Sequence, residues 1–223
     1  MKKLKKFLKK IELEERLSLA EILEAESAKP KHITQKMQSL YLSVFGQLFE
    51  LDPSYREILE KVADKLKIEI KENEFYDELS VKELEVKITQ HVFQAGLEQM
   101  TDEQRDEFEK ELTRVCGEFG KSGEVASSAG VLAALGAAQL SGFGVYLLAT
   151  STLGALTGAV GLTLPFAAYT AMSSTIAVVI GPVGWISAGL FAVWKLTGTN
   201  YKKLVPAIVF ITAARAKFDG GFE

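Results

Sequence analysis

The sequence predicts an all-α protein: a multi-helix bundle with amphipathic charged N-terminal helices packed around or beside a Gly/Ala-rich hydrophobic C-terminal helical hairpin. Three observations predict this class. Apolar residues in the first 120 positions recur at three- and four-residue steps, and helix-capping sequences precede several of these runs. No stretch alternates apolar and polar residues for long, as a half-buried strand would.

Charge is distributed unevenly along the 223 residues. Residues 1–124 hold 21 of the 26 basic and 27 of the 29 acidic side chains, and residues 195–223 have a net charge of +3. The 70 positions from 125 to 194 contain no Asp, Glu, Lys, Arg or His. We therefore expect a charged amphipathic helical region at 1–120, and a hydrophobic helical region with a basic C-terminal helix at 121–223.

The first predicted helix extends over about 25 residues with its apolar residues on one face. Pro30 is expected to stop it, because a proline inside a helix lacks the amide hydrogen that the helix needs. Six of the first ten residues are lysines, which could contact anionic lipid or nucleic acid but more often form the solvated face of a helix. The apolar residues of this helix are Leu4, Phe7, Leu8, Ile11, Leu19, Ile22 and Leu23.

Four further helices are predicted from their first residues. Thr34 is expected to cap the second helix, and Asp52 followed by Pro53 is expected to start the third. Two capping boxes, each a Ser or Thr followed three residues later by Glu or Gln, start at Ser80 and Thr101 and are the most specific local signals in the chain. The apolar stripe of the third helix is Tyr55, Ile58, Leu59, Val62 and Leu66.

The uncharged residues permit two interpretations. Their helices either form the centre of a bundle covered by charged helices, or they face lipid. Residues 176–194 are the better candidate membrane span, with nine Ile, Val, Leu or Phe residues among 19, and residues 131–149 are the second. Small residues spaced by four positions allow close helix packing, and the predicted packing residues are Gly154, Gly158, Gly184 and Ala188.

The better span predicts two sets of site residues. Trp194 followed by lysines is typical of the cytoplasmic end of a span, so Lys195, Lys202 and Lys203 are expected to contact lipid headgroups. Cations at an ordinary helix C-terminus are the alternative interpretation. The residues expected to face lipid are Ile176, Val179, Trp185, Leu190, Phe191 and Trp194.

Residues that commonly perform catalysis or bind metals are scarce. Cys116 is the only cysteine, which excludes an intramolecular disulfide and indicates a buried thiol in a reducing compartment. His91 is expected to be an ordinary helix residue, and no P-loop, dinucleotide fingerprint or Glu-x-x-His pattern is present. We therefore predict no enzymatic activity, cofactor, metal site or small-molecule substrate. The net charge of −3 argues against a nucleic-acid partner.

Marginal spans next to amphipathic helices, in a chain without a recognisable signal peptide, predict conditional membrane insertion. The expected function is that of a non-enzymatic bacterial protein that associates with or inserts into the membrane, as pore-forming toxins do. Its expected location is the cytoplasm and the inner membrane, with a protein partner or a homo-oligomer possible besides lipid. The alternative is a soluble chaperone-like or adaptor domain that binds a partner protein.

Several stretches resemble the YaaW family of uncharacterised bacterial proteins, part of which has been grouped with the helical ubiquinol–cytochrome c chaperone domain. The similar stretches are residues 55–68, 78–93, 181–185 and 201–217, together with the helix start near Thr101. The resemblance implies an α-helical fold with a hydrophobic C-terminal half. It supplies no catalytic residues.

Overall fold

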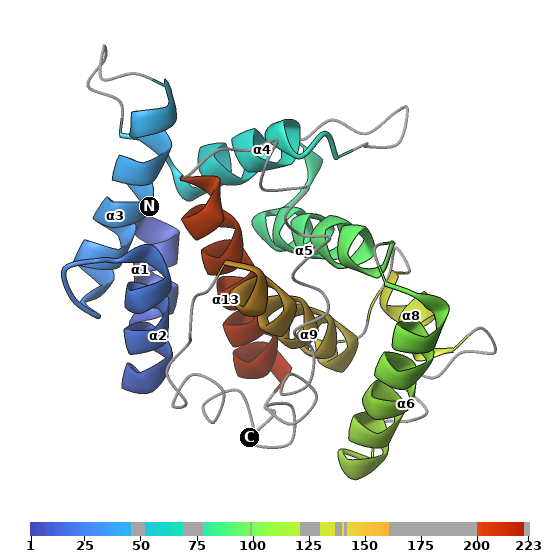
Figure 1. The fold of residues 1–223 in the computed structure, drawn as a ribbon. Coiled ribbons are helices and arrows are strands. Elements are labelled where there is room, and N and C mark those ends of the chain that lie inside the picture. Colours follow the sequence, from blue (N-terminus) through green and yellow to red (C-terminus); the bar gives the residue numbers. More distant parts are fainter. Residues whose placement is uncertain are drawn as a thin grey trace.

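The fold is known from a computed structural model. It describes residues 1–45, 52–68, 78–98, 100–120, 130–136, 140, 142–160 and 200–220, without the side chains of 43–45 and 154–160. These residues form nine α-helices and no strand (Figure 1), which confirms the predicted all-α class and the multi-helix bundle.

The N-terminal apolar residues lie on two helices, α1 (Lys2–Leu8) and α2 (Leu13–Leu23), so the prediction of one continuous helix was wrong. The break occurs because Glu12 has extended backbone angles and forms a capping box with Glu15, which starts a new helix. The predicted core face is confirmed, since Leu4, Phe7, Leu8, Ile11, Leu19, Ile22 and Leu23 are all buried.

Helix α3 (Pro30–Phe45) corrects two further predictions. Pro30 is the first residue of this helix, where its missing amide hydrogen costs nothing, and α2 ends earlier at a left-handed Glu24. Thr34 is therefore no cap. It lies inside the helix, and its hydroxyl donates to the carbonyl of Pro30 at 3.0 Å.

The three following helices begin with capping boxes. Helix α4 (Tyr55–Lys65) starts after Ser54, whose hydroxyl accepts from the amide of Glu57, so the predicted start at Asp52 and Pro53 was two residues early. Its predicted apolar stripe is buried. The boxes predicted for α5 (Val81–Leu97) and α6 (Asp102–Glu118) are confirmed.

The uncharged region contributes α8 (Val131–Gly136) and α9 (Gly142–Val160). The second candidate span, residues 131–149, is therefore divided between two helices and was wrong as a single element. Glycines, which are poor helix formers, lie at the end of α8 and the start of α9. In the part of the chain that the structure describes, no helix has the length and apolar character needed to cross a membrane. The better candidate, 176–194, lies outside the described residues.

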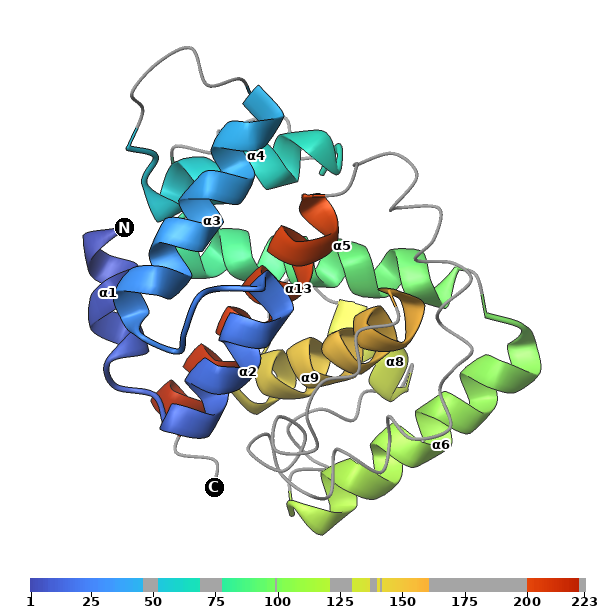
Figure 2. The ribbon, with the colours of Figure 1, turned by 60° about the vertical axis from the view of Figure 1, so that its left-hand side comes forward.

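Helix α13 (Tyr201–Gly220) occupies the centre of the molecule. It crosses α9 with the most extensive contact between any two described helices, and α2, α3, α4 and α5 cover its other sides (Figures 1 and 2). Its buried side chains point in all directions around the helix axis, from Tyr201 to Ala216. A helix with apolar residues on every face is expected in a core rather than at a surface.

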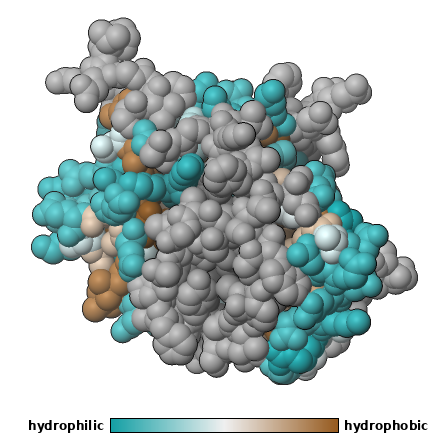
Figure 3. Space-filling view, viewed as in Figure 1, coloured by the Kyte–Doolittle hydropathy of each residue, from teal (hydrophilic) through white to brown (hydrophobic). Residues whose placement is uncertain are grey.

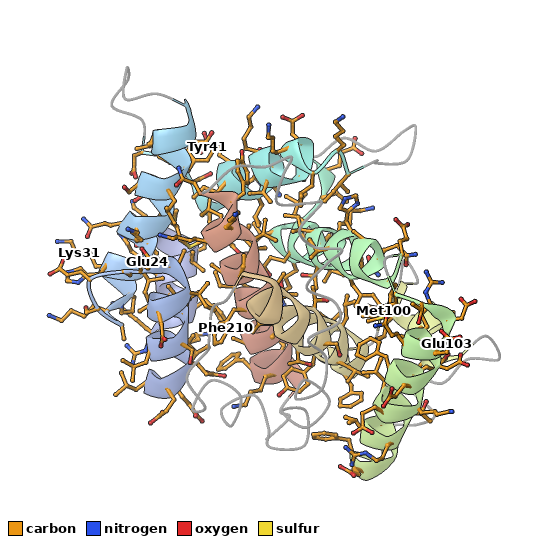
Figure 4. All side chains as sticks on the ribbon, viewed as in Figure 1. Glu24, Lys31, Tyr41, Met100, Glu103 and Phe210 are labelled. Atoms are coloured by element: carbon orange, nitrogen blue, oxygen red, sulfur yellow. The ribbon has the colours of Figure 1, made fainter. Side chains whose placement is uncertain are left out.

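Helix α6 lies at the edge of the molecule, where it packs mainly against α8. One apolar stripe faces inward, and the ring of Phe108 lies 6.3 Å from that of Phe93 of α5. In Figure 4, Glu103 lies at the outer side of α6 while Phe210 of α13 lies in the interior. The described core thus surrounds α13, with α6 as an outlying helix.

Candidate functional site

Two polar side chains of α13, Thr212 and Arg215, lie in the protein interior within the mostly apolar stretch 204–216 of this helix. Thr212 is 2% exposed, and its hydroxyl donates to the carbonyl of Ile208 at 2.9 Å. The Arg215 side chain is 18% exposed. A guanidinium in such a place requires a buried acceptor, because an unpaired buried charge is strongly destabilising.

Helix α5 supplies that acceptor. The Nε and Nη2 atoms of Arg215 donate to the two carboxylate oxygens of Glu85 at 2.8 and 3.0 Å, in the two-pronged geometry typical of Arg–carboxylate pairs. Glu85 is 1% exposed. One turn further on, the Thr89 hydroxyl donates to the Glu85 carbonyl at 2.8 Å and lies 3.4 Å from the Thr212 hydroxyl. These four side chains are called the buried polar cluster below.

Helices α1 and α2 close the cluster from the other side. The Arg215 guanidinium carbon lies 4.3 Å from the centre of the Phe7 ring, a cation–π arrangement. Lys217 lies 3.5 Å from a carboxylate oxygen of Glu15, a residue that is 4% exposed. The C-terminal half of α13 is thereby connected to α1, α2 and α5 through charged side chains.

Burial controls the titration of this region. Burial raises the pKa of Glu85, although Arg215 acts in the opposite direction. The pKa of Glu15 is also raised, first by burial, with the hydrogen bond from the Glu12 amide and the charge of Lys217 opposing it. Both carboxyls therefore take up a proton at a higher pH than exposed glutamates do.

Tyr55 of α4 lies against the same cluster. Its hydroxyl is buried and has no hydrogen-bond partner of regular geometry among the described residues. Burial, followed by the nearby charge of Glu85, raises the pKa of this phenol well above its ordinary value. The phenol therefore stays neutral, and the polar centre of the fold joins α4, α5 and α13.

The buried polar cluster is suited to holding helices together. Its carboxylate is enclosed and both of its oxygens are occupied by Arg215, which leaves neither oxygen open to a substrate or a metal ion. Elsewhere in the described ranges, His, Cys, Asp and Glu side chains nowhere form a group of three that could hold a metal ion. The arrangement fixes the position of α13 relative to the charged helices.

Most of the predicted membrane site lies outside the described residues. This applies to the six lipid-facing residues, to the packing residues Gly184 and Ala188, and to Lys195. Gly154 and Gly158 lie on α9, but their surroundings are not described. The described residues therefore do not test whether the predicted membrane-site residues lie together.

Two predicted headgroup contacts, Lys202 and Lys203, lie on the first turn of α13 and are half-buried. Lys203 Nζ is 2.5 Å from Glu24 Oε2, which joins α13 to the end of α2. This contact lowers the pKa of the Glu24 carboxyl, mainly through the hydrogen bond from Lys203. A headgroup contact by Lys203 would compete with this ion pair.

Cys116 and His91 are side chains whose surroundings were predicted from the sequence. Cys116 is buried as predicted, and burial raises the pKa of its thiol. His91 is half-buried on α5, and burial lowers its pKa despite the nearby charge of Glu98. Neither belongs to the buried polar cluster.

The pairing of Glu85 with Arg215 was not predicted from the sequence. A signal was present, since Arg215 is the one charged residue between positions 204 and 216 in an otherwise apolar stretch. Charged residues are almost never fully buried without a partner, so Arg215 indicates a buried carboxylate somewhere in the fold. Which of the 29 acidic residues supplies it is decided by the packing of α5 on α13.

Comparison with known proteins gives two relatives, both named UPF0174 protein and both from Helicobacter pylori. One, from strain J99, is 27% identical over 166 residues, which cover 73% of this chain and 61% of the relative. The other, from strain 26695, is 27% identical over 199 residues, covering 84% of this chain and 88% of the relative. No protein-family model and no solved structure matches the sequence.

These relatives correct the family prediction. The sequence resembles UPF0174 proteins, so the resemblance to the YaaW family was wrong. The short stretches on which the YaaW resemblance was based consist largely of helix-forming and apolar residues, which many helical proteins share.

Proposed function

We propose that the protein is a non-enzymatic helical protein that associates with a membrane, by inserting its uncharged region once that region separates from the charged helices. The supporting observation is the position of α9 and α13. These helices flank residues 161–199 on either side and pack against each other. Both contact the amphipathic helix α5, and α13 also contacts α2, α3 and α4. The segment 161–199 is therefore joined at its two ends to α9 and α13, two helices that pack against each other.

The hydroxyl groups of Thr150 and Thr152 in α9 fit the same proposal, whereas the buried hydroxyl of Ser151 has no hydrogen-bond partner among the described residues. Residues 146–153 are all buried, although three of them are Thr or Ser. Thr150 donates to the carbonyl of Tyr146 at 2.9 Å, and Thr152 donates to that of Leu148 at 2.7 Å. Hydroxyls that are satisfied within their own helix can be transferred to an apolar environment at little extra cost.

The proposed location is the cytoplasmic side of a bacterial inner membrane. Residues 125–194 contain no Asp, Glu, Lys, Arg or His, which removes the largest energetic barrier to entering lipid. The predicted roles of Ile176, Val179 and Trp194 in facing lipid, and of Lys195 in contacting headgroups, belong to this proposal. Pore formation or oligomerisation would be a later step of the same insertion.

A chaperone-like or adaptor domain is the second candidate function. It is favoured by the enclosure of α13, whose residues from 204 to 214 are all buried. In that case the uncharged region is core, and the partner protein binds the charged outer helices. The two candidates differ in whether the uncharged region ever contacts lipid.

Liposome flotation followed by carbonate extraction tests the proposal. Val179→Lys and Gly184→Lys each place a charge in the middle of the predicted span, which should oppose insertion by about 2.5–3.5 kcal/mol. The matched control is Ser39→Lys, which adds the same charge at an exposed position of α3. Carbonate-resistant association that is lost in both variants and kept in the control is the expected result.

The proposal fails if the natural chain is extracted completely by carbonate and releases no dye from vesicles. It also fails if both span variants insert as well as the control. Circular dichroism of all three variants establishes that they are folded before the membrane assay is interpreted.

A further inference from the structure

Helix α1 presents a concentrated basic surface. Leu4, Phe7 and Leu8 anchor it in the core, which turns the opposite side of the helix outward. Five lysines on that side are exposed and the sixth, Lys5, is half-exposed. The six members of this lysine face are Lys2, Lys3, Lys5, Lys6, Lys9 and Lys10.

Among the described residues, the positive charges of the lysine face are not neutralised by ion pairs. Lys61, Lys82, Lys203 and Lys217 each lie within 4 Å of a carboxylate. Across the ranges that the structure describes, none of the six lysines of α1 and its end has such a partner. Six like charges that repel one another within ten residues are retained at a cost in stability.

Exposed apolar residues adjoin the lysine face where α1 ends, α2 begins and α13 ends. Among the described residues, the three large hydrophobic side chains that are exposed are Leu13 (53% exposed), Leu17 (52%) and Phe218 (48%). Lys10 Nζ lies 5.3 Å from the centre of the Phe218 ring, and the Phe7 ring packs edge-on against it at 6.3 Å. Figure 3 shows hydrophobic surface beside hydrophilic surface at this end of α2.

Some of the described acidic groups near the lysine face form ion pairs, and others are exposed on α2. Asp219 pairs with Lys82 at 2.6 Å, and Glu15 faces Lys217. Glu12 and Glu14 lie at the N-terminus of α2, where the helix dipole favours negative charge. Glu21 remains exposed further along α2, beyond Leu17. The exposed carboxylates Glu12, Glu14 and Glu21 are fewer than the six lysines, so the described residues of this corner keep a net positive charge.

We propose that the lysine face and the exposed side chains Leu13, Leu17 and Phe218 form a docking surface for an anionic lipid bilayer. Lysines attract anionic headgroups, and apolar side chains among them enter the interfacial layer. A nucleic acid would use the lysines but gain nothing from the exposed apolar side chains, and the net charge of −3 disfavours it. This inference rests on the proposed function and assigns the surface that first contacts the membrane.

The test uses the full chain with vesicles of phosphatidylcholine, alone or with 30% phosphatidylglycerol. Lys6→Gln, Lys9→Gln and Lys10→Gln are combined in one variant, which should partition onto the anionic vesicles about 100-fold more weakly than the natural chain. The matched control combines Lys29→Gln, Lys31→Gln and Lys110→Gln, three exposed lysines outside this face, and should stay within about twofold of the natural chain. Phe218→Ser should weaken partitioning about tenfold.

Several results would overturn the inference. One is a natural chain that fails to bind the anionic vesicles. Another is a lysine variant that binds like its control, and a third is a natural chain that prefers a DNA duplex over the vesicles. Val179→Lys separates docking from insertion, because it should float with anionic vesicles at low salt yet be extracted by carbonate. Docking that fails while insertion persists overturns only this inference, whereas docking without insertion overturns only the proposed function.

Discussion

Helices α6 and α13 have similar lengths but opposite environments. Helix α6 has a capping box, a single buried stripe and an exposed charged side, and it lies at the edge of the molecule. Helix α13 contains Pro206 and has buried side chains all around its axis, yet it is the helix around which the others pack. The clearest local helix signals thus belong to the peripheral helix α6. The position of the central helix α13 is determined by the helices that pack around it.

The two helices also use charge differently. Arg114 of α6 pairs with Glu111 and Glu118 on its own exposed surface. Arg215 of α13 pairs with a buried glutamate of another helix. Exposed pairs within one helix contribute little to stability, whereas a buried pair is sensitive to the loss of either member.

The largest expected effect comes from breaking the buried pair. Arg215→Met leaves the Glu85 carboxylate buried without its partner and should lower the free energy of unfolding by about 3–5 kcal/mol. Urea denaturation followed by circular dichroism measures it. Arg114→Met is the control in α6 and should leave the unfolding midpoint nearly unchanged. The double variant Glu85→Leu with Arg215→Met should recover most of the lost unfolding free energy. If Arg215→Met and Arg114→Met lowered the unfolding free energy equally, the buried pair of α13 would be no more important for stability than the exposed pairs of α6.

The second effect concerns apolar packing. Phe210 of α13 is 1% exposed and enclosed on all sides, so Phe210→Ala should cost about 3–4 kcal/mol of unfolding free energy. Phe108 of α6 is 5% exposed, but the position of α6 at the edge of the molecule allows the site to relax, so Phe108→Ala should cost about 2 kcal/mol. Urea midpoints compare the two. A larger loss for Phe108 than for Phe210 would mean that α6 is the more important packing element.

A smaller effect is expected from the cap of α6. The Thr101 hydroxyl accepts from the amide of Gln104, and Thr101→Ala should cost about 1 kcal/mol. Hydrogen exchange should speed up in the first turn of α6 and stay unchanged in α13, because the cap acts locally. Thr101→Ser keeps the hydroxyl and serves as the control. Faster exchange throughout α13 would contradict the peripheral role of α6.

The smallest expected effect is a loss of folding stability at acidic pH that depends on His91. Burial lowers the pKa of His91, so the unfolded chain binds a proton near pH 6.5 while the folded chain does not, and stability should fall as the pH drops below that value. His91→Gln should remove this loss between pH 7 and pH 5 in urea denaturation. A pH dependence that is identical in the natural chain and in His91→Gln would exclude the histidine as its source.

The buried carboxyls act in the opposite direction. The pKa values of Glu15 and Glu85 are raised in the folded chain, so their contribution to stability is greatest at low pH and is lost as the pH rises through those values. Protonation of Glu85 therefore does not release α13, and mild acid is not expected to free the uncharged region through this pair.

Much of the charged half could be predicted from the sequence. The buried faces of α1, α2 and α4 and the capping boxes of α5 and α6 follow from spacing and capping chemistry, which act within a few residues. Boundary errors occurred where two local signals competed. Pro30 can end one helix or begin the next, and the sequence does not distinguish these roles, whereas the left-handed Glu24 shows that α2 has already ended.

By itself, the sequence determined the helical class, the separation of charged from uncharged residues, and the core faces of the amphipathic helices. Only the tertiary structure decided that α13 lies at the centre, that Glu85 among many carboxylates pairs with Arg215, and that the lysines of α1 adjoin Phe218 from the other end of the chain. The physical reason is the separation along the sequence between the residues that interact. Hydrophobic periodicity and capping depend on neighbours within one or two turns, whereas these pairings join residues more than 100 positions apart.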